Sequence, residues 1–219
     1  MPRFSKIDGS NRADHPRLEP DDEILYLYEY TSGRDYTFGA ANDLISNLKK
    51  EPSRAHRPEY RHKIAAMRRC AAEIAEALNP AWLNSATLVP VPPSKARGHP
   101  EYDDRMTQIC RGIPVSFPID VRELVIQRES MEAAHISSNP RPTVEELLGV
   151  YAIDEALAAP VPQRIGIVDD VLTAGTHYRA MTTVLRKRFP GVPIVGLFIA
   201  RRVFPPAATA EEMFGDDPV

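Results

Sequence analysis

The spacing of apolar residues changes along the first third of the chain, and each spacing predicts a different element. Aromatic side chains occupy every second position from Tyr26 to Tyr30, which predicts a half-buried strand over residues 24–30. Apolar residues then recur every three or four positions over residues 40–50 and again over residues 60–78. This period predicts two amphipathic helices, and Asn79-Pro80 should end the second, because proline cannot continue a helix.

Short apolar runs and helical patterns alternate over the rest of the chain. Thr143-Val144-Glu145-Glu146 has the spacing of a capping box, so a helix should begin there. The run from Val192 to Ala200 is apolar and β-branched, as in a parallel strand buried on both faces. The other predicted elements are strands at 87–91, within 119–126, at 151–153 and over the apolar run 164–168, and helices at 102–110 and 178–185.

Strands that alternate with helices predict an α/β fold, in which a mainly parallel central sheet is flanked by helices. A chain of 219 residues can bury one substantial core, which we assign to residues 23–203. Residues 1–22 are polar, and we expect a poorly ordered arm or a segment that binds a partner. Residues 127–142 should form a mobile loop over a site, and residues 204–219 an acidic tail.

The composition is ordinary for a soluble globular protein, with 43% hydrophobic and 26% charged residues. A net charge of −3 gives no global attraction to nucleic acid, although the basic stretch 54–63 is a local candidate. The alternative for that stretch is a solvated helix face. Cys70 and Cys110 lie on apolar sides of predicted helices and should be buried thiols in a reducing compartment. No run is long enough to span a membrane, and we expect a cytoplasmic protein.

The stretch from Arg164 to His177 carries the clearest chemical pattern. An apolar strand precedes the adjacent carboxylates Asp169 and Asp170, and a Thr/Gly turn containing Gly175 then leads into a helix. A tight turn at a helix N-terminus binds anions, because unpaired backbone N–H groups and the helix dipole converge there. The paired acids would repel a phosphate at close range, but they suit a sugar diol one sugar-length away. A plain capped turn is the structural alternative.

This stretch resembles the ribose-phosphate signature of the type I phosphoribosyltransferases. Within that family the chain is most similar to the ComF-like subgroup of competence-associated proteins, over roughly residues 36–203. The run from Leu88 to Gly98 resembles the "VPVP-SK-R-G" segment of the subgroup. The chain departs from the pattern in three ways: it lacks the zinc-ribbon cysteines, it carries Glu145-Glu146 in place of basic and amide residues, and its phosphate loop closes with His177 instead of a hydroxyl residue.

The resemblance implies a Mg²⁺-dependent enzyme that uses phosphoribosyl pyrophosphate, releases pyrophosphate and forms a homodimer. It implies that Asp169 and Asp170 hold the ribose hydroxyls and that Lys95 and Arg97 act at the leaving pyrophosphate. Most Mg²⁺ ligands would come from the substrate, with the two aspartates as the candidate protein ligands. The resemblance also implies that the 5-phosphate is surrounded by Thr173, Ala174, Gly175, Thr176 and His177. Further candidates are Ser94, Arg128 and Arg141 for the pyrophosphate, which needs cations and donors, and Arg201 and Arg202 for the acceptor, because they follow the last strand.

The acceptor is not specified by these residues. Enzymes of this family that act on oxopurines place an acid where this chain has Thr173, which disfavours that class. A second hypothesis is a non-catalytic module of the ComF-like type that senses a phosphoribosyl ligand or nucleotide, or assists DNA handling. A third is a structural subunit of a larger complex, for which the polar arm is the supporting feature.

Overall fold

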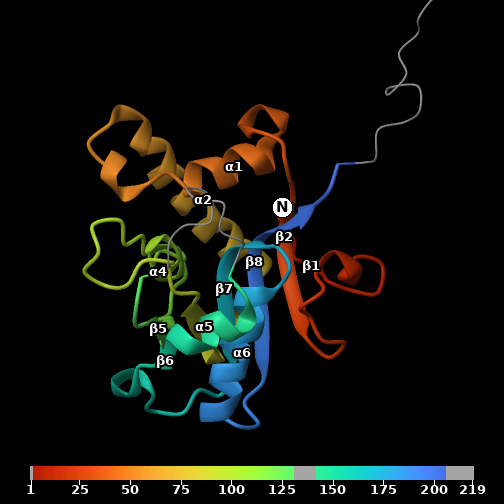
Figure 1. Ribbon diagram of the computed structural model, residues 1–219, viewed down its shortest axis with the longest axis vertical. Coiled ribbons are helices and arrows are strands. Elements are labelled where there is room, and N and C mark those ends of the chain that lie inside the picture. Colours follow the sequence, from red (N-terminus) through yellow and green to blue (C-terminus); the bar gives the residue numbers. More distant parts are fainter. Residues whose placement is uncertain (1, 131–141, 206–219) are drawn as a thin grey trace, which may run out of the picture.

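The computed structural model describes residues 2–130 and 142–205, which form a three-layer α/β structure (Figure 1). The predicted strand and helix order is confirmed almost throughout. The strands are β1 (Ser5–Lys6), β2 (Glu23–Thr31), β3 (Thr87–Pro90), β4 (Asp120–Val121), β5 (Val125–Gln127), β6 (Tyr151–Ile153), β7 (Ile165–Leu172) and β8 (Ile194–Val203). The helices are α1 (Ala40–Leu48), α2 (Arg61–Ala77), α3 (Pro80–Ser85), α4 (Arg105–Arg111), α5 (Val144–Val150) and α6 (Thr176–Arg188).

The central sheet has six strands in the order β1-β2-β8-β7-β3-β4. All neighbouring pairs are parallel except β1 with β2, so the predicted mainly parallel sheet is confirmed. The single strand expected within 119–126 is instead two strands. β4 joins the main sheet, whereas β5 pairs with β6 in a separate antiparallel ribbon.

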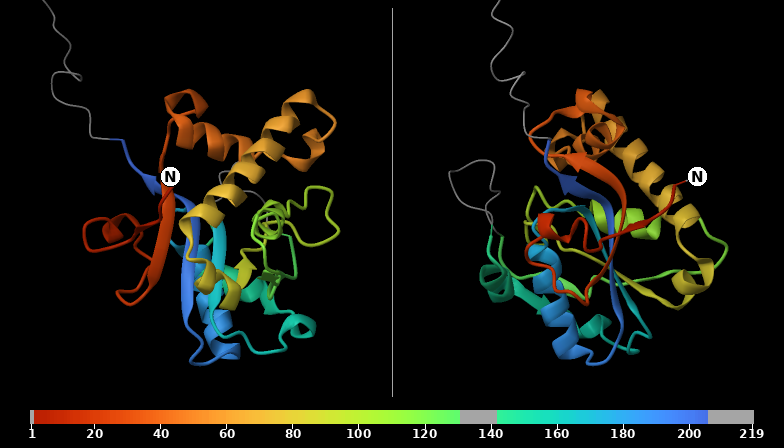
Figure 2. Two further views of the ribbon diagram at one scale, coloured as in Figure 1. Left: turned by 180° about the vertical axis from the view of Figure 1, so that it is seen from behind. Right: turned by 90° about the vertical axis from the view of Figure 1, so that its right-hand side faces the viewer.

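Helices lie on both faces of the sheet (Figure 2), and a hydrophobic cluster of buried side chains lies on each face. One cluster joins α5 and α6 to the strands through residues such as Leu147 and Leu185. The other joins α1, α2 and α4 to the opposite face through residues such as Leu44 and Ile109. Both cysteines are buried free thiols in this second cluster, as expected. None of the helices in the described ranges is long and apolar enough to cross a membrane.

Local signals in the sequence account for several element ends. Thr143 and Glu146 form the predicted capping box at the start of α5, each side chain bonding the backbone N–H of the other. Asn79 follows α2, and its side chain caps the short helix α3, which the sequence did not predict. Pro80 occupies the first position of α3, where its missing N–H costs nothing.

The N-terminal arm differs most from expectation, because residues 2–22 pack against their own domain. Ser5 and Lys6 pair with β2, and Ile7 is fully buried in the core. Asp22 is also buried, at 2% exposure. The arm therefore belongs to the same compact unit as the sheet. The expected loop and tail fall largely on residues 131–141 and 206–219, which lie outside the described residues.

The strand order reverses between β3 and β7. β3 leads through α4 to β4 on one side, whereas β7 leads through α6 to β8 on the other. Ligands of open parallel sheets bind where the order reverses, outside the carboxyl ends of the strands. Here those ends carry the segment after Pro90 and the turn after Leu172, so both predicted site segments meet at this edge.

Candidate functional site

The turn between β7 and α6 has the backbone geometry of an anion site. Gly175 caps the helix with φ 88° and ψ 11°, a left-handed conformation that glycine adopts without a side-chain clash. Thr176 and His177 begin α6, and no carbonyl within the helix can accept from their backbone N–H groups. These N–H groups and the helix dipole favour a bound anion. The Thr/Gly turn thus has the left-handed glycine and the helix start that the sequence indicated.

The N-terminal arm covers one side of this turn. His15 donates a hydrogen bond from Nδ1 to the carbonyl oxygen of Thr173, and the Arg17 N–H donates to that of Ala174 over 2.9 Å. A Cβ atom on Gly175 would lie 2.9 Å from Cδ2 of Leu18. Glycine is therefore required twice, by its φ angle and by the close approach of the arm. These contacts use carbonyl oxygens and leave the helix N–H groups unused.

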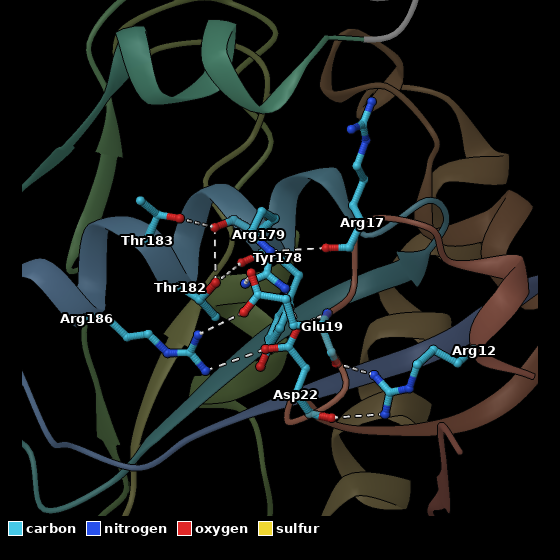
Figure 3. A network of polar contacts seen from close by, with 9 residues as sticks. All are labelled: Arg12, Arg17, Glu19, Asp22, Tyr178, Arg179, Thr182, Thr183 and Arg186. Atoms are coloured by element: carbon cyan, nitrogen blue, oxygen red, sulfur yellow. Dashed lines mark hydrogen bonds and ion pairs between the residues drawn. The ribbon is translucent and has the colours of Figure 1, made fainter. Parts of the chain in front are cut away.

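Ion pairs with helix α6 hold the arm in place (Figure 3). Asp22 accepts a hydrogen bond of 2.5 Å from Arg179 of α6, and Arg186 lies 3.5 Å from its other carboxylate oxygen. Glu19 lies 3.0 Å from the Arg179 guanidinium. No local pattern in the sequence predicts this contact, because the partners are more than 150 residues apart.

Asp170 does not line an open cleft, which corrects the expectation for one member of the acid pair. Its side chain lies on the face covered by α1 and α4 and is 6% exposed. Arg105 donates a hydrogen bond of 2.6 Å to its Oδ2, and Lys49 Nζ lies 3.8 Å from the same oxygen. Burial opposes ionisation, but the charges of Lys49 and Arg105 outweigh it and lower the pKa of Asp170.

Asp169 has different surroundings although it is adjacent in sequence. Successive side chains of a strand point to opposite faces, so it lies on the α5 and α6 side. Its Oδ1 accepts a hydrogen bond of 2.8 Å from the Asp170 backbone N–H. Burial and the neighbouring Asp170 carboxylate raise the pKa of Asp169. The two acids are therefore inequivalent: Asp170 is a firmly ionised structural partner, and Asp169 is a carboxylate with a perturbed pKa at the candidate site.

The His177 ring is directed away from a phosphate role. Its Nδ1 lies 2.8 Å from the Tyr151 hydroxyl at the start of β6, and burial lowers the pKa of the imidazole. The ring is therefore neutral near pH 7 and packs between α6 and the β5–β6 ribbon. Its backbone N–H remains the group available to an anion.

The cations expected at the pyrophosphate are only partly available. Arg97 is hydrogen-bonded to Glu123 and lies 3.5 Å from Asp154, so its charge is compensated. Lys95 has no ion pair within the described chain and lines a cavity of about 20 Å³, with room for about one water molecule. Ser94 accepts a hydrogen bond of 2.6 Å at its carbonyl from Gln127. Lys95 is thus the cation of this loop that a ligand could engage.

The arginines expected near the acceptor, Arg201 and Arg202, lie at the carboxyl end of β8, where the sequence pattern predicted them. Arg201 is 9% exposed, lies 3.1 Å from Asp14 of the arm and also pairs with Glu29. Its charge is therefore committed within the protein. The Arg202 guanidinium lies 4.6 Å from the Phe204 ring centroid. Arg128 is exposed and bonds Val150 through its backbone N–H, and Arg141 lies outside the described residues.

The basic stretch 54–63 is not a continuous cationic surface. Lys63 is 1% exposed, and its Nζ lies 2.6 Å from the Asp103 carboxylate and 2.6 Å from the Lys50 carbonyl oxygen. Arg54 lies 3.5 Å from Glu51, just before the stretch, and Arg57 lies 3.9 Å from Glu59 within it. Lys63 thus joins two segments instead of serving as a phosphate contact.

A magnesium ion fits this edge only in part. Asp170 already holds two cationic side chains, which take the place of a metal at its Oδ2. Asp169 is the remaining carboxylate, which suits an ion bound mainly through substrate oxygens. Elsewhere in the described chain, Glu19, Asp21 and Asp22 bring carboxylate oxygens within 4.8 Å of one another. Arg179 and Arg186 neutralise part of that cluster.

Sequence comparison adds no family assignment. A scan against protein-family models finds no match, and a search of curated proteins finds no similar sequence. The resemblance to phosphoribosyltransferases therefore rests on the sequence segments alone.

Proposed function

We propose that this protein binds phosphoribosyl pyrophosphate with Mg²⁺ and transfers the phosphoribosyl group to an acceptor, releasing pyrophosphate. The observation that carries the proposal is the turn at Gly175. It follows an acid pair at the carboxyl end of a central strand, beside the reversal of strand order, and opens a helix with free N–H groups. A ribose phosphate needs this combination, an anion site with a carboxylate one sugar-length away.

The chemistry assigns different tasks to the available groups. The N–H groups of Thr176 and His177, with the Thr173 hydroxyl, receive the 5-phosphate. Asp169 accepts hydrogen bonds from the ribose hydroxyls, and its charge favours the cationic ribose that develops as pyrophosphate leaves. Lys95 contacts the pyrophosphate. Asp170 acts by holding Arg105 at the edge of the site.

One observation favours a second candidate, a module that holds the same ligand without turnover. Arg97 and Asp170, two of the four residues assigned to the chemistry, are already engaged in ion pairs. Chemistry would require these contacts to rearrange, whereas ligand binding at the Gly175 turn would not. Pyrophosphate release in the presence of candidate acceptors distinguishes the two functions.

Calorimetric titration with phosphoribosyl pyrophosphate and Mg²⁺ tests the shared part of the proposal. We expect saturable binding that Asp169→Asn weakens at least tenfold, since hydrogen bonds to charged groups contribute about 1.5–3 kcal/mol. Glu76→Gln, an exposed position on α2, is the control and should bind as the parent does. Absence of binding at millimolar ligand, or equal binding by Asp169→Asn, would contradict the proposal.

A further inference from the structure

A second, larger pocket lies at the amino ends of the strands, on the edge opposite the Gly175 turn. Its volume is about 610 Å³, within the range of small-molecule sites. The wall comprises the end of α2 and helix α3, which lie beside the amino-terminal part of β8 in the left view of Figure 2. The pocket is lined by Phe4, Lys6, Glu23, Leu25, Ala77, Leu78, Asn79, Ala81, Trp82, Ser85, Arg164, Val195 and Leu197.

The floor of this pocket is an apolar sheet surface that the helices do not fully cover. Leu25 pairs with Leu197 in register, so their side chains lie side by side on β2 and β8. α2 ends at Ala77, and α3 has only six residues, which leaves the ends of these strands partly open. The Trp82 ring packs closely over Gly166: a Cβ atom at that position would lie only 3.0 Å from the ring. The indole therefore rests directly on the sheet.

The charges of the lining leave one cation uncompensated. Lys6 and Glu23 lie 3.2 Å apart and neutralise each other at one side. Arg164, just before β7, has no ion-pair partner in the described chain, and its Nε is shielded from water without a hydrogen-bond acceptor. A guanidinium offers a planar fork of donors that matches a carboxylate. The pocket thus combines an apolar floor, an aromatic wall and an unmatched cation.

We propose that this pocket binds a small apolar carboxylate, with its anionic end on Arg164 and its hydrocarbon or aromatic body along Leu25 and Trp82. The charged side chains of the lining carry a net charge of +1, which favours an anionic ligand. The apolar floor favours a ligand whose remaining part is hydrophobic. This site is separate from the Gly175 turn and does not depend on the function proposed there.

Trp82 is the only tryptophan of the chain, so its fluorescence reports occupancy of this pocket alone. We expect octanoate to change Trp82 emission saturably in the full-length protein. Octanol, which has the same chain without the charge, should bind at least tenfold more weakly. Arg164→Gln should remove this preference by weakening octanoate at least tenfold while leaving octanol unchanged. Arg68→Gln, an exposed arginine of α2, is the matched control and should behave as the parent does.

A second variant keeps the test independent of the Arg164 position. Ala81→Phe places a ring in the pocket from an exposed position of α3 and should abolish the response to both probes. Emission that stays constant up to about 10 mM octanoate overturns the proposal. So does equal binding of octanoate by the parent and Arg164→Gln. A change of emission with protein concentration, accompanied by a doubled mass, would instead identify the pocket as a contact between two copies of the chain.

Discussion

Arg105 Nη2 lies 2.6 Å from Asp170 Oδ2, while its Nη1 lies 2.7 Å from Asp103. The guanidinium thus joins the first turn of α4 to the central strand β7. Because Asp170 is almost fully buried, its charge depends on this contact more than on water. The pair fixes the position of α4 beneath the candidate site, and it separates the roles of two adjacent acids that look identical in the sequence.

Arg105→Met should lower the free energy of unfolding by about 3–5 kcal/mol, since it leaves a buried carboxylate without its main partner. Urea unfolding near pH 7 measures the loss. Lys49→Ala is the matched control. Its side chain is 47% exposed and 3.8 Å from Asp170, so it should cost less than about 1 kcal/mol. Equal losses in the two variants would show that Asp170 depends on Lys49 as much as on Arg105, and would contradict the role given to the Arg105 contact.

Asp169→Asn should stabilise the protein near pH 8 by about 1–2 kcal/mol. Burial and Asp170 raise the pKa of Asp169, so the folded state favours the protonated acid. The resulting penalty is absent below the pKa of Asp169 in the unfolded chain, near 4, grows as the pH rises toward the pKa in the folded protein, and is complete above it. The gain should therefore vanish at about pH 4, as unfolding at both pH values will show. A gain in stability combined with weaker ligand binding is expected of a functional carboxylate, and a pH-independent effect would contradict the raised pKa.

Gly175→Ala should be more destabilising than Gly191→Ala, although both glycines have a positive φ, 88° and 81°. Each variant incurs about 1–2 kcal/mol of backbone strain. A Cβ atom at Gly175 also meets Leu18 at 2.9 Å, whereas nothing lies within 4 Å of one at Gly191. Thermal unfolding of both variants measures the difference. Adding Leu18→Ala to Gly175→Ala should recover part of the lost stability. If it does not, Leu18 of the arm does not pack against Gly175.

Asp22→Asn tests whether the arm is part of the folded domain. The substitution removes the carboxylate charge opposite Arg179 and Arg186, and we expect a loss of about 2–4 kcal/mol in unfolding free energy. Asp21→Asn is the neighbouring control, because that side chain is exposed and should change stability by less than about 0.5 kcal/mol. If Asp22→Asn were equally silent, residues 2–22 would not be held by these ion pairs.

The hydrophobic period predicted local elements well, because it reflects which face of each element is buried. The capping residues Thr143 and Glu146 likewise fixed the start of α5 from adjacent positions. The sequence did not predict that Arg105 would neutralise Asp170, since that contact joins elements 65 residues apart. It did not predict the arm either. A polar segment can be ordered by ion pairs and one buried side chain, here Ile7, without any periodic pattern.

The backbone conformation of the candidate site could be predicted from its residue types. The directions of its side chains could not, because they depend on contacts with distant segments. Gly175 lies in the left-handed conformation that the Thr/Gly turn indicated. The directions of His177 and Arg97 depend on Tyr151 and Glu123, which come from the β5–β6 ribbon and the segment beside it. No spacing rule relates those positions to the turn, so only the tertiary arrangement reveals them.

The pairing of β2 with β8 also determines when the chain can fold during synthesis. Glu29 and Arg201 form an ion pair across these strands although 172 residues separate them in sequence. β2 therefore leaves the ribosome long before β8 is synthesised. The backbone N–H and C=O groups that β2 directs toward β8 stay unpaired until nearly the whole described chain has been translated. Such long-range pairing slows folding and leaves a nascent strand open to aggregation. Ribosome-bound chains that stop before Ile194 should consequently remain protease-sensitive through Glu23–Thr31 and depend on chaperones for solubility.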